Sequence, residues 1–142
     1  GDTQLTLSQK IPVSGAVIVT TPQDIALIDA QKGLAMFEKV NIPILGIVEN
    51  MSIHICSNCN HAEEIFGNGG GERMAATSNT KFLGALPLKL EIRTDVDEGT
   101  PSVAKDPESK VSMMYQQIAR NVAATLSLQS ESIGAFPKIT IE

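Results

Sequence analysis

The segment best suited to chemistry is His54-Ile-Cys-Ser-Asn-Cys-Asn-His61, in which Cys56 and Cys59 lie three positions apart. This spacing lets two thiolates bind one metal ion from a single short stretch of chain. A structural zinc site requires four ligands, and a four-iron cluster held by thiolates requires four cysteines. The sequence contains only these 2 cysteines, so one copy of the segment supplies half of such a site.

The missing ligands have two possible sources. His54 and His61 could complete a zinc shell within one chain, although four ligands would then be closer together in sequence than zinc sites usually place them. A second copy of the chain could instead present its own cysteine pair across a two-fold axis, and we expect this simpler geometry. A redox pair, which normally lies where a strand meets a helix, and an inert pair are the remaining alternatives.

Two further features lie close to the cysteines. Asn50 follows a predicted strand, at the carboxyl edge where open α/β sheets bind ligands. Its amide could contact the edge of an adenine, or equally it could cap the next turn. Gly67–Gly71 could form a backbone nest for an anion. The segment lacks the Lys-Ser/Thr pair of a phosphate loop, however, and we expect it to be a flexible hinge.

Apolar runs of strand length predict the sheet that positions these residues; they cover residues 14–20, 43–49 and 81–86. Hydrophobicity in the first two runs is continuous, which is typical of strands buried on both faces. A helical pattern over 21–40 separates them, with Thr21 as its cap and Pro22 at its first position. Strand, helix and strand at this spacing predict a βαβ unit with parallel strands.

The rest of the chain is less regular. Residues 50–71 have no hydrophobic periodicity, and we expect a long functional loop there. A short helix is expected over 72–78, and 95–107 is polar and turn-rich. The last helix should open at Asp106-Pro107 and bury an apolar stripe that runs to Leu126. We expect one domain over residues 1–128 and a mobile tail over 129–142.

Composition excludes several function classes. The formal net charge is −5, which argues against a nucleic-acid or anionic-membrane surface. With no Trp and 1 Tyr, the chain also lacks stacking platforms for single-stranded nucleic acid. No apolar run approaches the ~20 residues that span a bilayer, and no signal peptide opens the chain. The cysteine pair suits a reducing compartment, so we expect a cytoplasmic protein.

Several segments together resemble the Mrp/ApbC family of ATP-binding iron–sulfur cluster carriers, in the MinD-like branch of deviant P-loop ATPases. The resemblance covers roughly residues 1–128. Gly1-Asp2-Thr3 resembles the end of the family's switch element, so we expect the sequence to be cut from a larger protein. The other matching segments are residues 21–33, 46–52 with the Cys56/Cys59 pair, 66–71, 84–88, Ile92-Arg93, and Asp97, Gly99 and Pro101.

This resemblance implies an α/β fold, namely the C-terminal part of a P-loop NTPase-type three-layer fold with a mainly parallel sheet. It implies a homodimer bridged by one [4Fe–4S] cluster on Cys56 and Cys59 of both chains. The cluster would be delivered to apo iron–sulfur proteins under the control of ATP and Mg²⁺. The resemblance also implies that Asn50 and the backbone near Pro87 border the adenine.

One departure from the family concerns phosphate chemistry. The family's phosphate loop, Gly-Lys-Gly-Gly-Val-Gly-Lys-Ser/Thr, does not occur in this sequence, and phosphate and Mg²⁺ binding depend on it. We therefore expect no catalytic residue within residues 1–142 and no ATP hydrolysis by them alone. The alternative functions are a zinc-bridged dimerisation module and a MinD-like positioning ATPase. The lack of an amphipathic membrane helix in the tail disfavours the second.

Overall fold

A parallel sheet of three strands organises the fold of residues 2–133, the part of the chain that the computed structural model describes. The strands are β1 (Ala16–Thr20), β2 (Ile44–Glu49) and β5 (Phe82–Ala85), in the order β1-β2-β5. Both neighbouring pairs are parallel, which confirms the predicted sheet. Glu49 pairs with Thr20 on one side and Ala85 on the other, so the carboxyl ends of the strands lie together.

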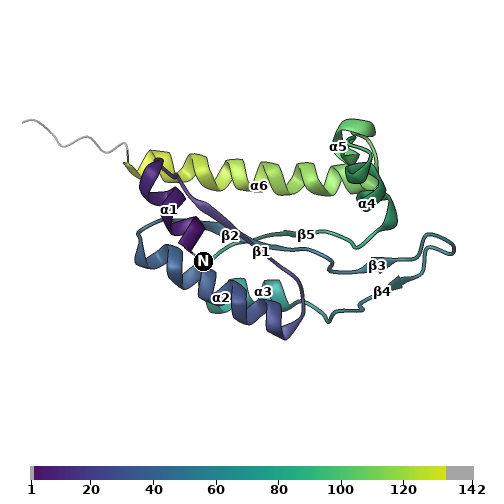
Figure 1. The fold of residues 1–142 in the computed structure, drawn as a ribbon, viewed down its shortest axis with the longest axis horizontal. Coiled ribbons are helices and arrows are strands. Elements are labelled where there is room, and N and C mark those ends of the chain that lie inside the picture. The colour runs from purple at the N-terminus through teal and green to yellow at the C-terminus, as the bar shows by residue number, and fades with distance from the viewer. Residues whose placement is uncertain (1, 134–142) are drawn as a thin grey trace, which may run out of the picture.

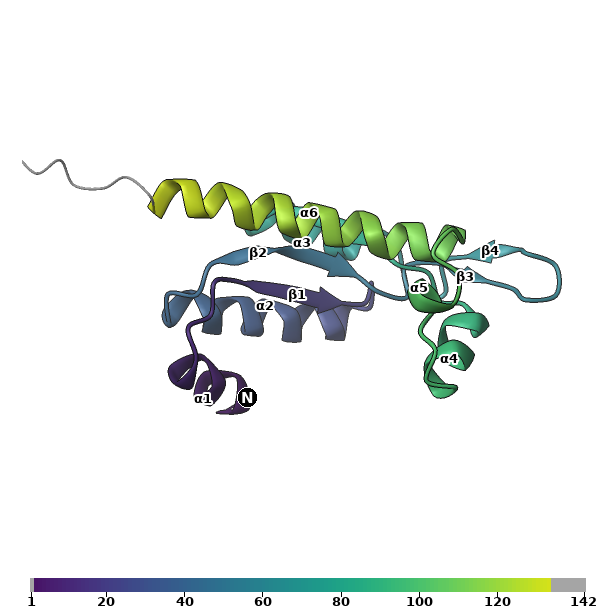
Figure 2. The same ribbon diagram turned by 90° about the horizontal axis from the view of Figure 1, so that it is seen from above.

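Helices cover both faces of this sheet (Figure 1, Figure 2). One face carries α2 (Asp24–Lys39) and α3 (Gly70–Thr77), and the other carries α6 (Lys110–Ile133). The first core joins Ile18 and Ile47 of the sheet to Leu34 of α2 and Met74 of α3. The second core is built on Val48, Leu83 and Leu86, against which Tyr115, Ile118 and Val122 of α6 pack. The predicted α/β layering is therefore confirmed.

Helix α2 begins later than predicted. It starts at Asp24 with Gln23 as its N-cap, and Thr21 donates its hydroxyl to Gln23 Oε1 (3.1 Å) instead of capping the helix. The buried Pro22 belongs to the turn before the helix, so its predicted place at the first helical position was wrong. The turn packs against the start of α3, as the close approach to Gly70 shows: a Cβ there would lie 3.1 Å from the Pro22 carbonyl oxygen.

The end of α2 agrees with the prediction. Asn41 adopts a left-handed conformation (φ 58°) and donates its N–H to Glu38 O, while Ile42 N–H reaches back to Phe37 O, each at 3.0 Å. These two bonds form a Schellman motif, which closes the helix on its last carbonyl groups.

Sequence patterns did not predict the small elements. These are α1 (Asp2–Lys10), the hairpin strands β3 (His54–Ile55) and β4 (Ala62–Glu63), α4 (Leu90–Asp97) and α5 (Ser102–Lys105). Helix α1 buries none of its residues, so it leaves no core-facing stripe to detect. The two short hairpin strands lie within the long irregular loop that we expected between residues 50 and 71, and α3 begins at its end, at Gly70.

Helix α6 also begins later than predicted. Ser109 Oγ accepts the N–H of Ser112 (3.1 Å), the position that an N-cap side chain bonds, and the helix starts at Lys110. Asp106, the expected cap, accepts the N–H of Glu108 within the preceding turn (3.1 Å). The helix runs to Ile133, past the expected domain limit at residue 128, and the rest of the expected tail, 134–142, lies outside the described residues. Among the helices described, none is long and apolar enough to span a membrane.

Candidate metal centre

Cys56 and Cys59 lie at the turn of the β3–β4 hairpin, which extends away from the body of the molecule (Figure 1, Figure 2). The hairpin is antiparallel, with Ile55 opposite Ala62. Cys56 N–H donates to His61 O (3.0 Å), and Asn60 N–H donates to Cys56 O (2.9 Å). These bonds fold the cysteine segment into a tight turn, which brings the two thiols to one place.

The backbone of this turn favours the thiolate of Cys56. Hydrogen bonds from the backbone N–H of Cys59, then from that of Asn58, and then from the Cys59 thiol lower the pKa of the Cys56 thiol. Both cysteines are free thiols, and Cys59 is exposed while Cys56 is half-buried. Because the thiolate is the form that binds metals, a turn of this kind can offer two sulfur atoms to one metal ion.

The two histidines do not complete this site within one chain. His54 is half-buried in β3, whereas His61 is exposed beyond the turn. No group of three or more His, Cys, Asp or Glu side chains within residues 2–133 is placed to hold a metal ion. The structure of these residues therefore gives no support to the local zinc shell.

The first arm of the hairpin is fastened to the segment after β5. Ser52 N–H donates to Leu86 O (2.9 Å), and Leu88 and Ile53 are joined by a bond from Leu88 N–H to Ile53 O (2.8 Å). Ile55 N–H donates in turn to Leu88 O (3.1 Å). Pro87, which we expected beside an adenine, is buried in the middle of this segment at the base of the hairpin. The pairing is undisturbed because only residues 86 and 88 have to donate an N–H there.

The glycine segment after the hairpin is a packed junction, not the flexible hinge that we expected. Gly70 and Gly71 are buried in the first turn of α3. A Cβ at Gly70 would lie 2.6 Å from Leu27 Cδ1, and a Cβ at Gly71 would lie 3.0 Å from Glu49 Cβ. Gly71 N–H donates to Glu49 Oε2 (2.6 Å). Because an internal carboxylate accepts this N–H, the segment is not a ready cradle for an outside anion.

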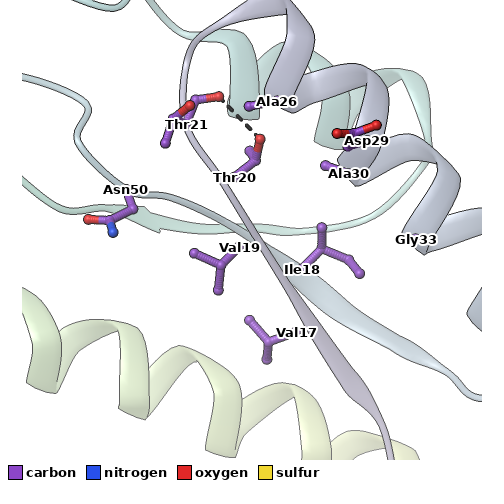
Figure 3. Close-up of a pocket in the computed structure, with 10 residues that line it drawn as sticks. All are labelled: Val17, Ile18, Val19, Thr20, Thr21, Ala26, Asp29, Ala30, Gly33 and Asn50. Carbon is purple, nitrogen blue, oxygen red and sulfur yellow. Dashed lines mark hydrogen bonds between the residues drawn. The ribbon is translucent and has the colours of Figure 1, made fainter. Parts of the chain in front are cut away.

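Asn50 lines a cavity of about 480 Å³ beside β1 and α2 (Figure 3). Thr20, Thr21 and Asp29 are also in its lining. The amide oxygen of Asn50 accepts the N–H of Met51 (2.9 Å), so the side chain closes a turn and borders the cavity at once. Pro87 is not among the residues that line this cavity, and the structure does not bring the two expected nucleotide-binding positions to one cavity.

The same cavity lies along an open edge of the sheet. β1 is the outer strand in the described part of the chain, and Val19 is 61% exposed. The prediction that this strand is buried on both faces is therefore wrong for the described residues, since no further strand or helix covers Val19 there.

Comparison with known families decides where this chain belongs. The profile of the ParA family described as NUBPL iron-transfer P-loop NTPases matches residues 1–123. The chain belongs to this family. The iron–sulfur cluster carrier protein of Escherichia coli K12 is 61% identical over 133 residues, which are 94% of this chain and 36% of that protein. The iron–sulfur cluster transfer protein NUBPL of Mus musculus is 50% identical over 92% of this chain and 41% of that protein.

Solved structures of P-loop NTPases share the fold. A nucleotide-binding protein from Archaeoglobus fulgidus, solved in complex with ADP, superposes with a TM-score of 0.63 and 32% identity, over 77% of this chain and 44% of that one. The cell-division ATPase MinD of Pyrococcus furiosus superposes with a TM-score of 0.59 over 78% of this chain and 43% of that one. At 24% identity, MinD shows the likeness of fold alone. The chain thus spans less than half the length of each of these relatives.

Proposed function

We propose that this member of the NUBPL iron-transfer family carries an iron–sulfur cluster on Cys56 and Cys59 and passes it to apo-proteins. The observation that carries the proposal is the tight turn of the two free thiols on an outlying hairpin, where backbone N–H groups favour the thiolate of Cys56. A pair on an outlying turn, with Cys59 exposed and Cys56 half-buried, can meet both a second ligand pair and an acceptor. The names of the Escherichia coli and mouse relatives support the same function.

The ligand arithmetic leads to a homodimer with a [4Fe–4S] cluster. Such a cluster uses four thiolates, and each chain offers 2 cysteines. Two hairpins facing each other across a two-fold axis would supply all four from the same surface of each protomer. The cluster is the cargo in this proposal, so its ligands must hold it and also release it. We place the carrier in the cytoplasm, because free thiolates suit a reducing compartment.

Nucleotide control is the second part of the proposal. Asn50 would contact the adenine from the carboxyl edge of the sheet, where open α/β sheets bind ligands, and the backbone near Pro87 would border the same base. The cavity that Asn50 lines supports the Asn50 contact, whereas Pro87 lies outside that cavity. Residues 1–142 do not fit the phosphates or Mg²⁺, because they lack the phosphate loop and because Gly71 N–H is bonded to Glu49. We therefore derive no phosphate step from these residues, which we interpret as the C-terminal part of the domain.

The test is anaerobic reconstitution of the complete protein with iron and sulfide, followed by measurement of iron, sulfide and zinc per chain. We expect about two iron atoms per chain, since a four-iron cluster would be shared by two chains. Cys56→Ser and Cys59→Ser should each remove most of this iron. Ser57→Ala, in the same exposed turn, is the matched control and should retain it.

Two outcomes would contradict the proposal. A full complement of iron in either cysteine variant would mean that the ligands have been wrongly assigned. Zinc at about half an ion per chain, without the charge-transfer colour of thiolate-bound iron, would point instead to a zinc-bridged dimerisation module that uses the same cysteines.

A further inference from the structure

Glu49 is a buried carboxylate that the proposed function does not use. It ends β2 and is 2% exposed. Its Oε1 accepts the hydroxyl of Ser52 (2.7 Å), and its Oε2 accepts the N–H of Gly71 (2.6 Å). Among the ion pairs of residues 2–133, none includes Glu49. Burying a carboxylate without a cation is costly, so its two hydrogen bonds must compensate for much of the lost hydration.

The two partners of Glu49 stand at the two ends of the cysteine-bearing segment. Ser52 leads into β3, and Gly71 follows the return of the chain from β4. Gly71 is separated from Glu49 by 22 positions in sequence, with the whole hairpin between them. One carboxyl group therefore closes the base of the hairpin.

The second arm depends on this contact more than the first. The first arm has its own backbone bonds to Leu86 and Leu88. Beyond its pairing with β3, the second arm has exposed hydrogen bonds, such as Asn68 Nδ2 to Glu64 Oε1 (2.7 Å) and Arg73 Nη1 to Asn68 O (2.6 Å). Two-stranded hairpins are marginal on their own, so a buried anchor at the base has more influence on position than the exposed bonds.

The chemistry of the contact selects a carboxylate. A hydroxyl and a backbone N–H both donate towards the same side chain, so two acceptor oxygens are needed at once. Gln would offer one oxygen and would turn an N–H₂ donor towards one of the two donors. Gly69, the N-cap of α3, has no side chain to cap the helix. Glu49 takes over that role from another element, and its negative charge suits the helix N-terminus.

We propose that Glu49 is a positioning residue for the cluster ligands: it locks both arms of the hairpin to the sheet and thereby fixes where Cys56 and Cys59 are presented. This inference rests on the proposed function for its consequence, since two hairpins must bring four sulfurs to one cluster. Because the hairpin extends from the body, a small rotation at its base moves the thiols at its turn by more. Glu49 acts through the hairpin and makes no contact with the cluster.

The experiment compares Glu49→Gln with Glu72→Gln in the complete protein. Glu72 lies exposed in the first turn of α3, so its replacement removes the same charge near the same helix end and leaves the anchor intact. We expect Glu49→Gln to raise amide hydrogen exchange in residues 52–66 by about tenfold or more, because the base of the hairpin loses an anchor to the sheet and opens more often. Exchange in β1 and α6 should stay as in the wild type, as should all exchange in Glu72→Gln.

Cluster loss to an iron chelator provides the second readout. Glu49→Gln should release iron several-fold faster than the wild type, while the visible spectrum stays that of a thiolate-bound cluster because the ligands are unchanged. Glu49→Asp keeps both oxygens on a shorter side chain and should restore part of the retention. Ser52→Ala removes one donor and keeps the bond to Gly71, so it serves if Glu49→Gln does not fold. It should raise exchange in residues 52–66 alone, by a smaller factor.

Two results would overturn the inference. Exchange in residues 52–66 could be the same as in the wild type, or it could rise equally throughout the protein, which would make Glu49 a general stability residue. The exchange measurement is made without the cluster. It therefore decides the anchoring role of Glu49 even if the wild type binds zinc or no metal, in which case it is the proposed function that fails.

Discussion

The amide of Asn50 carries two roles at one position. Its oxygen accepts the N–H of Met51 in an exposed turn, while the side chain lines the cavity at the carboxyl edge of the sheet. A hydrogen bond in such a turn contributes about 0.5–1.5 kcal/mol. A polar group of a bound base that loses its partner costs about 1–3 kcal/mol. The two roles therefore predict different outcomes for substitutions that separate the oxygen from the amide N–H₂ group.

We predict that Asn50→Ala weakens ATP binding to the complete protein by about 5- to 150-fold, which is the equivalent of 1–3 kcal/mol, while its melting temperature changes little. Asn50→Asp is the informative companion, because it keeps the acceptor for Met51 N–H but loses the donor. It should weaken ATP binding as well. Isothermal titration and thermal melts give both quantities. Unchanged ATP affinity in both variants, with a lower melting temperature in Asn50→Ala alone, would reduce Asn50 to a turn cap.

At this scale the sequence predicts a residue when the signal is local. The Cys56 and Cys59 pair is a spacing within four positions, so its metal chemistry could be inferred without any fold. Glu49 was not singled out, because its partner Gly71 is 22 positions away and is joined to it only by folding. The one available signal was a carboxylate at the end of an apolar strand, where burial makes a charged residue unusual.

The junction of α4, α5 and α6 shows how polar contacts position short elements. Asp95 of α4 is 7% exposed and accepts the hydroxyl of Ser102 (2.8 Å) and the ammonium group of Lys105 (2.6 Å), both from α5. Ser112 of α6 donates its hydroxyl to the backbone oxygen of Ser102 (2.9 Å). The hydrogen bonds from Lys105 and then Ser102 hold the pKa of Asp95 below its ordinary value.

We predict that Asp95→Asn lowers the melting temperature at neutral pH and that the difference from the wild type shrinks in acid. A carboxyl group whose folded pKa is depressed stabilises the fold above its unfolded pKa, about 3.9, and that contribution is lost as the pH falls through the folded pKa. The measurement is a series of thermal melts of both proteins from neutral pH down to the lowest pH at which the wild type stays folded.

Asp97→Asn is the matched control for this prediction. Asp97 pairs with Arg93 at 3.2 Å on the same helix, and both side chains are exposed. Exposed pairs of this kind contribute about 0.2–1 kcal/mol, so the melting temperature should change little. If the two variants melted alike at every pH, the buried network would not be what holds α4 to α5.

Among the helices and strands, too, those with a local sequence pattern were predicted, and those held by distant contacts were not. The three strands were predicted because their apolar runs reflect burial in a parallel sheet, and α2 and α6 because of their apolar stripes. Their starts were misplaced by two or three residues, since Pro22 and Pro107 lie in the turns before the helices and not inside them. The hairpin and α4–α5 were not predicted, because they are held by hydrogen bonds to Leu86, Leu88 and Asp95. Such bonds leave no periodic pattern in the sequence.

At the scale of the whole molecule, the groups of interest gather at the carboxyl ends of the strands. Glu49 ends β2 and Asn50 follows it, and both the cysteine hairpin and the α4–α5 pair extend from this end (Figure 1, Figure 2). The edge of the sheet at β1 is open, and Val19 is exposed there and lines the cavity. The chain spans 36% of the length of its Escherichia coli relative. Residues 1–142 lack a phosphate loop, so the proposed function assigns no phosphate step to them.

The last prediction is that residues 1–142 alone show no significant ATP hydrolysis. Phosphoryl transfer requires backbone amides and a lysine around the phosphates, together with a metal held by hydroxyl and carboxylate groups. The glycine segment cannot substitute for them, because Gly71 N–H is bonded to Glu49 and the next residue, Glu72, would repel a phosphate. The guanidinium of Arg73 is bonded to Asn68 O (2.6 Å).

Phosphate release should be measured for residues 1–142 and, in parallel, for the complete protein. A circular dichroism spectrum checks that residues 1–142 are folded. Turnover at the rate of the complete protein, lost on substituting a residue within 1–142, would show that the chemistry lies in this part of the chain after all.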